Sequence, residues 1–297
     1  MGIEKQNKLQ DFKGHIERQT LHEGFTATNV TGVGVYKASH IHSKSPYLYE
    51  PLICLIAQGE KVCHVGAEVY RYQAGNFFIN FLPMPVQTEI VEASSEQPFL
   101  SAALDIDLVR LADIILQIER VEEETGEKTL QKSSCVLVGD ANEELIDVFN
   151  RLLIVASDRR DAKVLGNAIV DEIYYRILTS DHGFALRKLL NQYGQIQPVA
   201  KAVNFIHANL NKTIQVSELA SLSNMSKTAF FNAFKRLMHV PPNQYIKATK
   251  LQKAQALLVQ GMQANEASYH VGYNSFSQFS REYKRFFGFP PSQTAAA

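Results

Sequence analysis

The sequence contains one pattern that could bind a catalytic metal. His40 and His42 are separated by one residue, a spacing with which metal-binding motifs of barrel enzymes begin. The acid expected three or four residues beyond His42 is absent, because Pro46 and Tyr47 stand there, and Phe78 occupies the region where another histidine would follow. Two histidines without a third and a fourth ligand are more often ordinary surface or core residues. We therefore expect no bound metal and no cofactor.

Other catalytic chemistry also lacks its residues. The sequence contains no phosphate-binding glycine loop, nucleophile elbow or His-Glu-x-x-His helix, so we expect no catalytic residue and no enzyme activity. The three cysteines Cys54, Cys63 and Cys135 fit no zinc spacing and cannot form a disulfide framework, which agrees with a reducing compartment. Cys54 and Cys63 fall on adjacent predicted strands, where they act either as small hydrophobic residues or as thiol sensors.

The distribution of charge indicates a different kind of partner. Residues 201–297 carry eleven lysines and arginines against three acids, a formal charge of +8, and the rest of the 297-residue chain carries −8 because the whole is neutral. A basic region confined to one end of a neutral chain is typical of a domain that binds nucleic acid. Because a basic face is often only solvated surface, the motifs within this region decide between the two interpretations.

The basic region contains a repeat with a period of 49 residues. The period aligns Ser226 with Ser275, Phe230 with Phe279, Phe234 with Tyr283, Lys235-Arg236 with Lys284-Arg285, and Pro241-Pro242 with Pro290-Pro291. Each copy has the pattern of a helix-turn-helix unit, in which a short helix and a turn precede a serine that caps a second helix. A longer helix from about residue 243 to 260 separates the copies and is expected to hold them in fixed relative positions.

Placing the repeated aromatic residues inward determines which side chains of each second helix face outward. Outward side chains in a major groove contact base edges, and lysines and arginines beside them contact phosphates. We expect base contacts from Thr228, Phe231, Asn232, Phe276, Ser277, Ser280 and Arg281. We expect phosphate contacts from Ser226, Lys227, Lys235, Arg236, Ser275, Lys284 and Arg285. Arg281 is the best single base-reading candidate, because arginine commonly pairs with O6 and N7 of guanine.

The first two thirds of the chain has a different organisation. Seven or more short strands rich in Val, Ile, Phe and Tyr are predicted between about residues 24 and 105, which favours an antiparallel barrel or double sheet. Such a barrel can enclose a ligand, and the residues expected to line an effector pocket, or else to be ordinary core, are Leu55, Val62, Tyr70, Tyr72, Phe77 and Ile79. Apolar residues at helical spacing between 108 and 177 predict helices that cover the barrel or form a twofold dimer interface.

The C-terminal third resembles the AraC/XylS family of bacterial transcription regulators. HVGYNSFSQFSREYKRFFGFPPSQ closely matches the signature of the family, and LASLSNMSKTAFFNAFKRLMHVPPNQYIKATKLQKAQALL is similar to its first unit and connecting helix. The match covers about residues 200–293 and departs at Asn232, where the family usually has Arg or His, and at His239, where Gly is common. The resemblance implies two recognition helices in successive major grooves about 34 Å apart, with the second as the safer specificity element.

The N-terminal part resembles the cupin-like regulatory domain of the same family. The resemblance rests on PLICLIAQGEKVCHVGAEVYRYQAGNFFI and LPMPVQTEIVEASSEQPFLSAALDID, and it implies a ligand-sensing or dimerising domain. The alternative function is a cupin-type metal enzyme, a dioxygenase or isomerase, with an accessory basic helical domain. Stoichiometric metal that is lost on His40→Ala would support that alternative.

Together these observations predict an α+β protein of two domains. Residues 1–180 form a cupin-like antiparallel β-barrel with following helices, residues 181–199 form a linker, and residues 200–297 form an all-α domain with two helix-turn-helix units joined by a long helix. We expect a sequence-specific transcription regulator whose partners are double-stranded DNA, an unidentified small-molecule effector, a second copy in a homodimer and, for an activator, RNA polymerase. The sequence has no secretion signal and no run of about 18 apolar residues, which predicts a cytoplasmic protein without a membrane partner.

Overall fold

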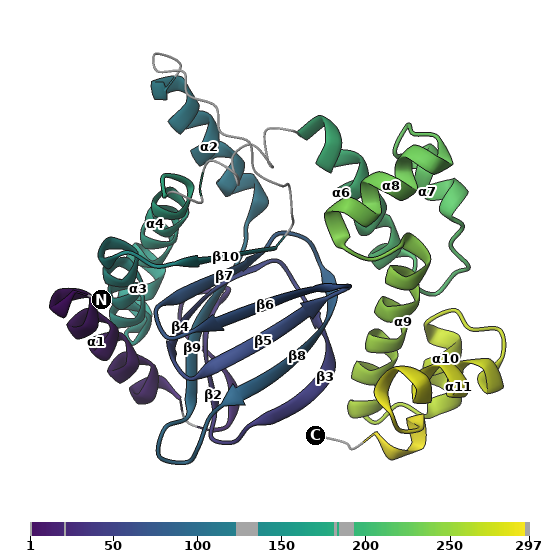
Figure 1. The fold of residues 1–297 in the computed structure, drawn as a ribbon, viewed down its shortest axis with the longest axis horizontal. Helices are drawn as coiled ribbons and strands as arrows, with labels where there is room; N and C mark the ends of the chain where they lie inside the picture. The colour runs from purple at the N-terminus through teal and green to yellow at the C-terminus, as the bar shows by residue number, and fades with distance from the viewer. Residues whose placement is uncertain (1, 21, 123–135, 181–182, 184–192, 295–297) are drawn as a thin grey trace.

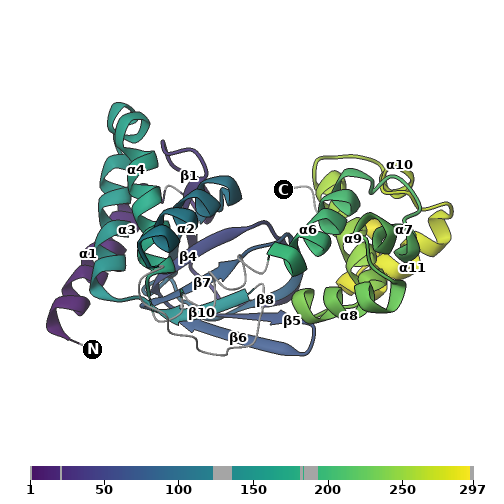
Figure 2. The same ribbon diagram turned by 90° about the horizontal axis from the view of Figure 1, so that it is seen from above.

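The computed structural model describes residues 2–20, 22–122, 136–180, 183 and 193–294. Figure 1 shows a group of helices near the N-terminus, two β-sheets in the middle and a body of C-terminal helices on the far side of the sheets. The view from above in Figure 2 has the same order, so the sheets separate the two groups of helices. The predicted fold, an antiparallel β-barrel with following helices and a helical C-terminal part, is confirmed.

The barrel consists of two antiparallel sheets. The six-stranded sheet has the order β1-β2-β9-β4-β7-β10, and the four-stranded sheet has the order β3-β8-β5-β6. The strands are β1 (Gly24–Ala27), β2 (Val33–Ala38), β3 (His42–Tyr49), β4 (Leu52–Gln58), β5 (Glu60–Val65), β6 (Glu68–Gln73), β7 (Asn76–Asn80), β8 (Met84–Glu92), β9 (Phe99–Asp105) and β10 (Val136–Asp140).

Most of these strands coincide with predicted ones. Three tight connections contain Gly59, Gly66 and Gly75, whose φ angles of 81°, 62° and 84° lie in the left-handed region that glycine adopts without strain. Strands β3 and β10 were not predicted. Strand β10 lies beyond residue 105, where only helices were expected, and most residues of β3 are polar or exposed, with Pro46 among them. A proline is tolerated there because β3 is the edge strand of its sheet.

Four helices lie on the side of the barrel formed by the six-stranded sheet. They are α1 (Ile3–Gln19), α2 (Leu108–Glu122), α3 (Glu143–Ala156) and α4 (Arg159–Leu178). Helix α1, which the sequence analysis did not predict, packs on β4 and β9 and places Phe12 against Phe149 of α3 with ring centroids 5.9 Å apart. The side chain of Asn142 caps α3 by accepting a hydrogen bond from the amide of Leu145. The six-stranded sheet is therefore covered on its outer face as well as on its inner face.

The predicted apolar stripes of these helices are largely buried. Leu145, Val148, Phe149 and Leu152 of α3 are all at most 2% exposed. In α4 the buried face instead includes Gly166, where an added Cβ would lie 2.9 Å from Val30. Leu165, which the predicted stripe places on the buried face, is 46% exposed. The side chains of Leu108 and Ala112 and the whole of residues 123–135, Cys135 included, lie outside the described residues.

The C-terminal helices follow the predicted plan of two units and a connecting helix. They are α6 (Tyr193–Ala208), α7 (Val216–Leu222), α8 (Lys227–Met238), α9 (Pro242–Val259), α10 (Ala264–His270) and α11 (Phe276–Phe287), followed by a short 3₁₀ turn at Pro291–Gln293. Helices α7 and α8 form the first helix-turn-helix unit, α10 and α11 form the second, and α9 connects them (Figure 1). Helix α6 begins within residues 181–199, the segment assigned to the linker, and most of that segment lies outside the described residues.

Candidate nucleic-acid interface and ligand cavity

The two units repeat in structure as well as in sequence. Ser226 and Ser275 each accept a hydrogen bond from an amide of the first turn, so that each caps the N-terminus of its second helix. The same helices end at His239 and Gly288, which lie 49 residues apart and have left-handed φ angles of 58° and 88°. His239 stands where the family commonly has glycine, and it still ends α8 in the left-handed conformation in which Gly288 ends α11.

Helix α8 buries one face and exposes the other. Phe230, Phe234 and Leu237 are at most 2% exposed and pack in the core of the unit. The other predicted DNA-contacting residues of this unit are exposed, apart from the half-buried Phe231, and they are Ser226, Lys227, Thr228, Asn232, Lys235 and Arg236. Asn232 and Arg236 also line a groove with Lys201 and Asn224, so the exposed face extends beyond the helix itself.

Helix α11 has the same division. Phe279 and Tyr283 are fully buried, and the exposed residues among those predicted to contact DNA are Ser275, Phe276, Ser277, Arg281, Lys284 and Arg285. Ser280 is half-buried, and Phe276 stays 39% exposed although its ring lies 6.2 Å from that of Phe279. Arg285 also lines a groove between α11 and the four-stranded sheet, together with Lys247 and Glu282.

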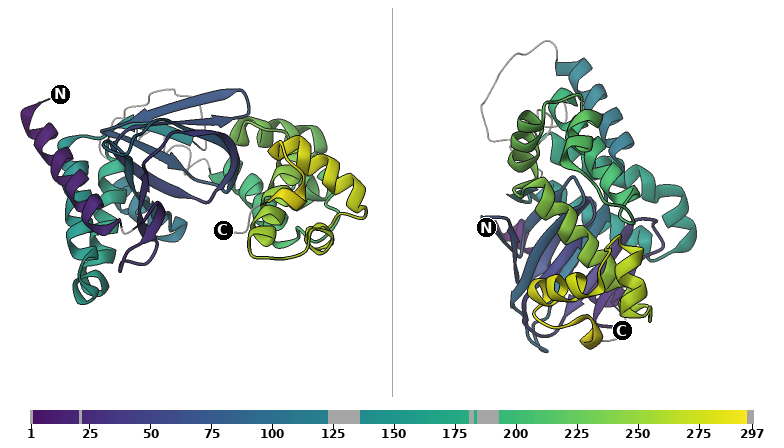
Figure 3. Two further views of the ribbon diagram at one scale, coloured as in Figure 1. Left: turned by 90° about the horizontal axis from the view of Figure 1, so that it is seen from below. Right: turned by 90° about the vertical axis from the view of Figure 1, so that its right-hand side faces the viewer.

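Several cations on these two faces have no carboxylate partner in the described part of the chain. Lys227, Lys235, Arg281 and Lys284 form no ion pair there, whereas Arg151 of α3 and Arg176 of α4 do. Unpaired cations on exposed helix faces are available to phosphates and to base edges. Figure 3 shows that the C-terminal helices form the outer end of the molecule, away from the N-terminal helices. The predicted base and phosphate contacts remain predictions for each of these residues.

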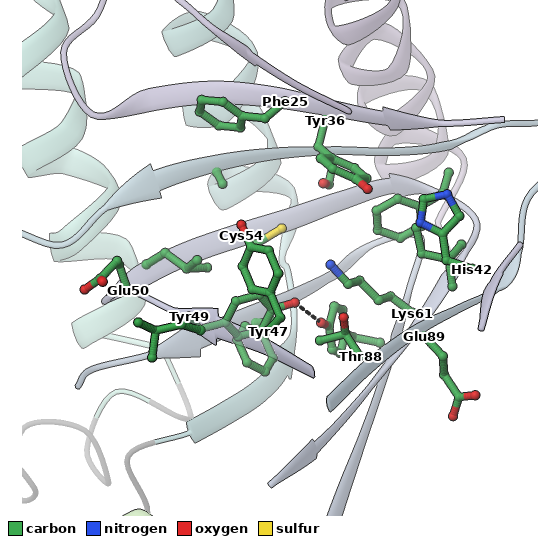
Figure 4. Close-up of a pocket in the computed structure, with 18 of the residues that line it drawn as sticks. Phe25, Tyr36, His42, Tyr47, Tyr49, Glu50, Cys54, Lys61, Thr88 and Glu89 are labelled. Carbon is green, nitrogen blue, oxygen red and sulfur yellow. Dashed lines mark hydrogen bonds between the residues drawn. The ribbon is translucent and has the colours of Figure 1, made fainter. Parts of the chain in front are cut away.

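A cavity of about 400 Å³ lies between the two sheets. Its walls are mostly aromatic or aliphatic, and side chains from both sheets contribute, among them Tyr36, Cys54 and Phe99 from the six-stranded sheet and Tyr49 and Tyr72 from the four-stranded sheet. Figure 4 shows Lys61 directed into this space between the aromatic side chains. An apolar enclosure with a few polar groups is the usual form of a small-molecule site.

Lys61 is the cation of this cavity. Its Nζ lies 5.4 Å from the ring centroid of Tyr49, 5.5 Å from that of Tyr36 and 6.0 Å from that of Phe99. No carboxylate of the described residues forms an ion pair with it, and burial lowers the pKa of its ammonium group. An ammonium group held among aromatic faces without a counter-ion attracts an anion that enters the cavity. Lys61 was not among the predicted pocket residues, because a lysine in a strand resembles a surface residue.

Polar groups occupy other parts of the cavity wall. The hydroxyl groups of Tyr49 and Tyr72 are 3.2 Å apart and form a hydrogen bond, and burial raises the pKa of both, so they stay protonated. Glu50 and Asp105 also line the cavity, and burial raises the pKa of each carboxyl group, with the charge of Asp105 adding to the effect on Glu50. The wall therefore offers hydrogen-bond donors and acceptors apart from the ammonium group.

Only one of the six predicted effector-pocket residues lines this cavity. Tyr72 does, whereas Leu55, Val62, Tyr70, Phe77 and Ile79 do not. Cys54 pairs with Phe78 across β4 and β7 on the cavity face, so the pairs Leu55–Phe77 and Ile53–Ile79 occupy the opposite face, which α1 covers. Because both faces of the six-stranded sheet are buried, both alternating sets are apolar, and the alternation alone does not identify the inner set.

The described residues add no support for metal binding at His40 and His42 or for thiol sensing by Cys54 and Cys63. Among the described residues no group of three or more His, Cys, Asp or Glu side chains could hold a metal ion, and the exposed His40 and His42 gain no third ligand. Cys54 and Cys63 lie in different sheets rather than on adjacent strands of one sheet. Burial raises the pKa of both thiols, that of Cys63 to about 12, so neither is a reactive thiolate at neutral pH.

The fold places this protein in the class of helix-turn-helix proteins with an N-terminal β-barrel domain. Residues 29–185, more than half of the chain, match the family described as the AraC-type transcriptional regulator N-terminus, and residues 219–297 match a helix-turn-helix domain family. The chain belongs to the family of AraC-type transcriptional regulators.

Individual relatives agree with this assignment. The chain is 29% identical over 135 residues to the HTH-type transcriptional regulator GbdR of Pseudomonas aeruginosa, a match that covers 45% of this chain and 37% of the relative. It is 30% identical over 98 residues to the XylDLEGF operon transcriptional activator of Pseudomonas putida, covering 32% of this chain and 30% of that protein. These matches thus span about a third of the length of the curated relatives.

The solved structures share the overall fold. ToxT from Vibrio cholerae, in a crystal structure with a bound unsaturated fatty acid, has a TM-score of 0.55 and 12% identity, covering 88% of this chain and 93% of that one. A second ToxT structure, bound to (E)-4-(8-methylnaphthalen-1-yl)but-3-enoic acid, has a TM-score of 0.56. Within the residues that the structure describes, no helix is long and apolar enough to cross a bilayer.

Proposed function

We propose that this protein is a transcription regulator that binds specific double-stranded DNA through its two helix-turn-helix units. The observation that carries the proposal is the repeated recognition helix, capped by a serine in each copy, with exposed cations on its outer face. Two such helices on one chain read two neighbouring sites, which raises specificity beyond that of one helix. The family assignment and the named relatives support this activity over that of a metal enzyme.

The purified full chain tests this function directly. Genomic fragments retained by the protein are sequenced, and the affinity for a selected fragment is compared with that for a scrambled one at two salt concentrations. We expect the selected fragment to bind at least 10³-fold more tightly, the lower end of the usual range for specific regulators. Equal affinity for both fragments at each salt concentration would rule out a sequence-specific regulator.

The cavity is the proposed effector site, and its chemistry favours a monocarboxylic acid with an apolar body. Lys61 supplies a half-buried cation without an ion-pair partner among the described residues, and aromatic side chains supply the apolar wall. The ligands named for the two ToxT structures, an unsaturated fatty acid and a naphthyl-butenoic acid, have this combination of groups. A carboxylate in contact with the ammonium group satisfies a charge that burial otherwise penalises.

Matched pairs of ligands test the effector class. We expect free acids, but not their methyl esters, to raise the melting temperature of the full chain, because only the acid carries the anion that Lys61 attracts. Lys61→Met removes the cation and is expected to abolish the difference between acid and ester. Lys44→Met, which removes an exposed lysine from β3, serves as the control and keeps the difference. Equal responses to acid and ester in the wild-type chain would refute this effector class.

The position of the cavity supports regulation through the four-stranded sheet. Strands β3 and β8 line the cavity on one side and contact α9 on the other. Tyr245 of α9 donates a hydrogen bond to the carbonyl oxygen of Pro83, which directly precedes β8, and therefore accepts one from Nε2 of His207 at 2.9 Å. Gly66, in the turn after β5, packs against the carbonyl of His239. A ligand that moves this sheet changes the set of orientations open to the DNA-binding units.

The remaining partners follow from the same function. A homodimer is supported by apolar side chains that stay exposed on α3 and α4, among them Ile154 at 52%, Val164 at 70% and Leu165 at 46%. Sedimentation of the wild-type chain and of Val164→Glu tests it, because a buried charge at an isologous interface is opposed by its own copy. RNA polymerase is the further partner if the protein activates transcription, and the cytoplasm is the compartment in which it meets DNA.

A further inference from the structure

The two helix-turn-helix units do not share one hydrophobic core. The buried residues of the first unit are continuous with the core of the barrel, and helix α9 contributes Tyr245 and Ile246 to it. The buried residues of the second unit form a separate cluster, to which α9 contributes residues from Leu251 onward. The connecting helix therefore passes from one core to the other between Ile246 and Leu251. Apolar packing across this break does not by itself fix one unit against the other.

A buried lysine lies in this break. Lys250 is 7% exposed, and its Nζ donates hydrogen bonds to the carbonyl oxygen of Lys212 at 2.8 Å and to that of Gly272 at 3.4 Å. Lys212 belongs to the loop between α6 and α7, which leads into the first unit, and Gly272 belongs to the turn between α10 and α11 of the second. Lys250 forms no ion pair within the described part of the chain. One ammonium group thus joins the loops of both units.

The two loops are in direct contact at this point. Gly272 has a φ angle of 73°, and a Cβ at this position would lie 2.7 Å from the carbonyl carbon of Asn211 and 2.8 Å from Nζ of Lys250. The next residue, Tyr273, donates a hydrogen bond to Glu282 of α11 at 2.9 Å, and its ring centroid lies 6.0 Å from Nζ of Lys250. A chain of contacts therefore runs from Lys250 through the turn to the second recognition helix.

We propose that Lys250 is a positioning residue that fixes the orientation of the second recognition helix relative to the first, and so determines the spacing between the two DNA sites that one chain binds. This inference rests on the proposed DNA-binding function. Linked units gain affinity over a single unit only when their geometry lets both engage at once. A rigid link therefore makes binding tight at one spacing between the two DNA sites and weak at slightly shorter or longer spacings. With a loose link the affinity depends less on the spacing.

A series of duplexes measures the effect. Each carries the two sites found by fragment selection, with zero, one or two base pairs inserted or deleted between them, and further duplexes carry one site with the other scrambled. For Lys250→Met we expect affinity about tenfold lower at the natural spacing, as for the loss of a charge-assisted hydrogen bond, with a flatter dependence on spacing. Binding to single-site duplexes is expected to stay at the wild-type level.

Two further variants separate geometry from charge and from stability. Lys250→Arg keeps the donors and is expected to restore much of the spacing dependence. Lys253→Met removes an exposed lysine of the same helix and is expected to leave that dependence unchanged. The proposal is overturned if Lys250→Met keeps the wild-type spacing profile, or if it weakens single-site and two-site binding equally, as simple destabilisation would. A wild-type chain that binds no specific DNA would overturn the proposed function itself, a result distinct from both.

Discussion

Three lysines show how position changes the chemistry of one residue type. Lys61 is enclosed by aromatic rings in the cavity, Lys250 is buried between two loops, and Lys284 is exposed on a recognition helix. Burial lowers the pKa of Lys61 and of Lys250, because a low-dielectric environment disfavours the charged form. The first suits an anionic ligand, the second holds carbonyl groups in place, and the third is available to phosphates.

Substitutions on α11 are expected to separate base contacts from phosphate contacts. Arg281→Ala removes the side chain predicted to pair with guanine, so we expect operator binding to weaken by about 1 to 3 kcal/mol and the preference at one base pair to be relaxed. Lys284→Ala weakens binding to all sequences alike and lowers the slope of log affinity against log salt by about one unit. Titrations of selected and random duplexes over a range of salt measure both effects. Equal losses on specific and random DNA for Arg281→Ala would remove its role in base recognition.

The lowered pKa of Lys61 gives a prediction for pH. Between this lowered pKa and the ordinary lysine value, the unfolded chain binds more protons than the folded chain, so the free energy of unfolding rises with pH in that window. The stabilisation by a bound acid falls over the same range, because the ammonium group loses its charge. Thermal denaturation with and without ligand across alkaline pH measures both trends, with Lys61→Met as the reference that lacks them. A ligand effect that grows with rising pH would contradict the assignment.

At the scale of the elements, each recognition helix is delimited by its own sequence. Ser226 and Ser275 cap the N-termini, and His239 and Gly288 end the helices in left-handed conformation. These local signals give the two helices the same length of 12 residues, with cores of matched aromatic residues. What differs is the outward face, where Asn232 and Arg281 occupy aligned positions in the 49-residue repeat. The second helix is therefore the one with an arginine at the position predicted to contact a base.

The cap of α11 is expected to contribute measurably to stability. Ser275→Ala leaves the amide of Gln278 without its side-chain acceptor, which lowers the free energy of unfolding of the second unit by about 1 kcal/mol. Ser292→Ala, at an exposed serine that caps no α-helix, is the control and is expected to change stability by less than about 0.5 kcal/mol. Denaturant titrations of the two variants measure the difference. Equal effects would show that the cap contributes nothing beyond an exposed hydroxyl.

At the scale of the whole molecule, the four-stranded sheet lies between the ligand cavity and the DNA-binding units. Figures 1 and 2 both show the C-terminal helices beside this sheet, with the N-terminal helices on the opposite side of the barrel. The hydrogen bond from Tyr245 to Pro83 and the packing of Gly66 against His239 join the sheet to the first unit. The second unit contacts β3 through α11. The sheet therefore connects the cavity physically with the two helix-turn-helix units.

This arrangement predicts a reciprocal coupling. An effector that changes the affinity for operator DNA by some factor must itself bind with an affinity changed by the same factor when DNA is present. Tyr245→Phe removes the hydroxyl that joins α9 to Pro83, and we expect it to bring this factor closer to one, while DNA affinity without effector stays within about threefold of wild type. Ligand titrations with and without operator DNA measure the factor. An unchanged factor in Tyr245→Phe would exclude this contact as a route of coupling.

The DNA-binding part was largely readable from the sequence, and the ligand cavity was not. Helix caps, glycine turns and the 49-residue repeat depend on residues near one another in the chain, so they identify α7 to α11 and their exposed faces. The cavity depends on which face of a doubly covered sheet points inward. Cys54 and Phe78 point to one face of the sheet, and Leu55 and Phe77 point to the other. Both sets alternate along their strands in the same way, and only the packing of α1 on one face shows which set is turned away from the cavity. Neither α1, which covers the outer face of that sheet, nor β3, which lines the cavity, was predicted from the sequence.

The sequence by itself determined the class of the protein, its two-part organisation, the basic C-terminal third and the residues that its recognition helices expose. These follow from local periodicity, capping and charge, which act over a few residues. Only the tertiary structure decided that Lys61 lies in a cavity, that Lys250 joins two loops and that one sheet lies between cavity and DNA-binding units. The physical reason is that burial, and with it pKa and hydrogen-bond partners, depends on which distant segments pack together.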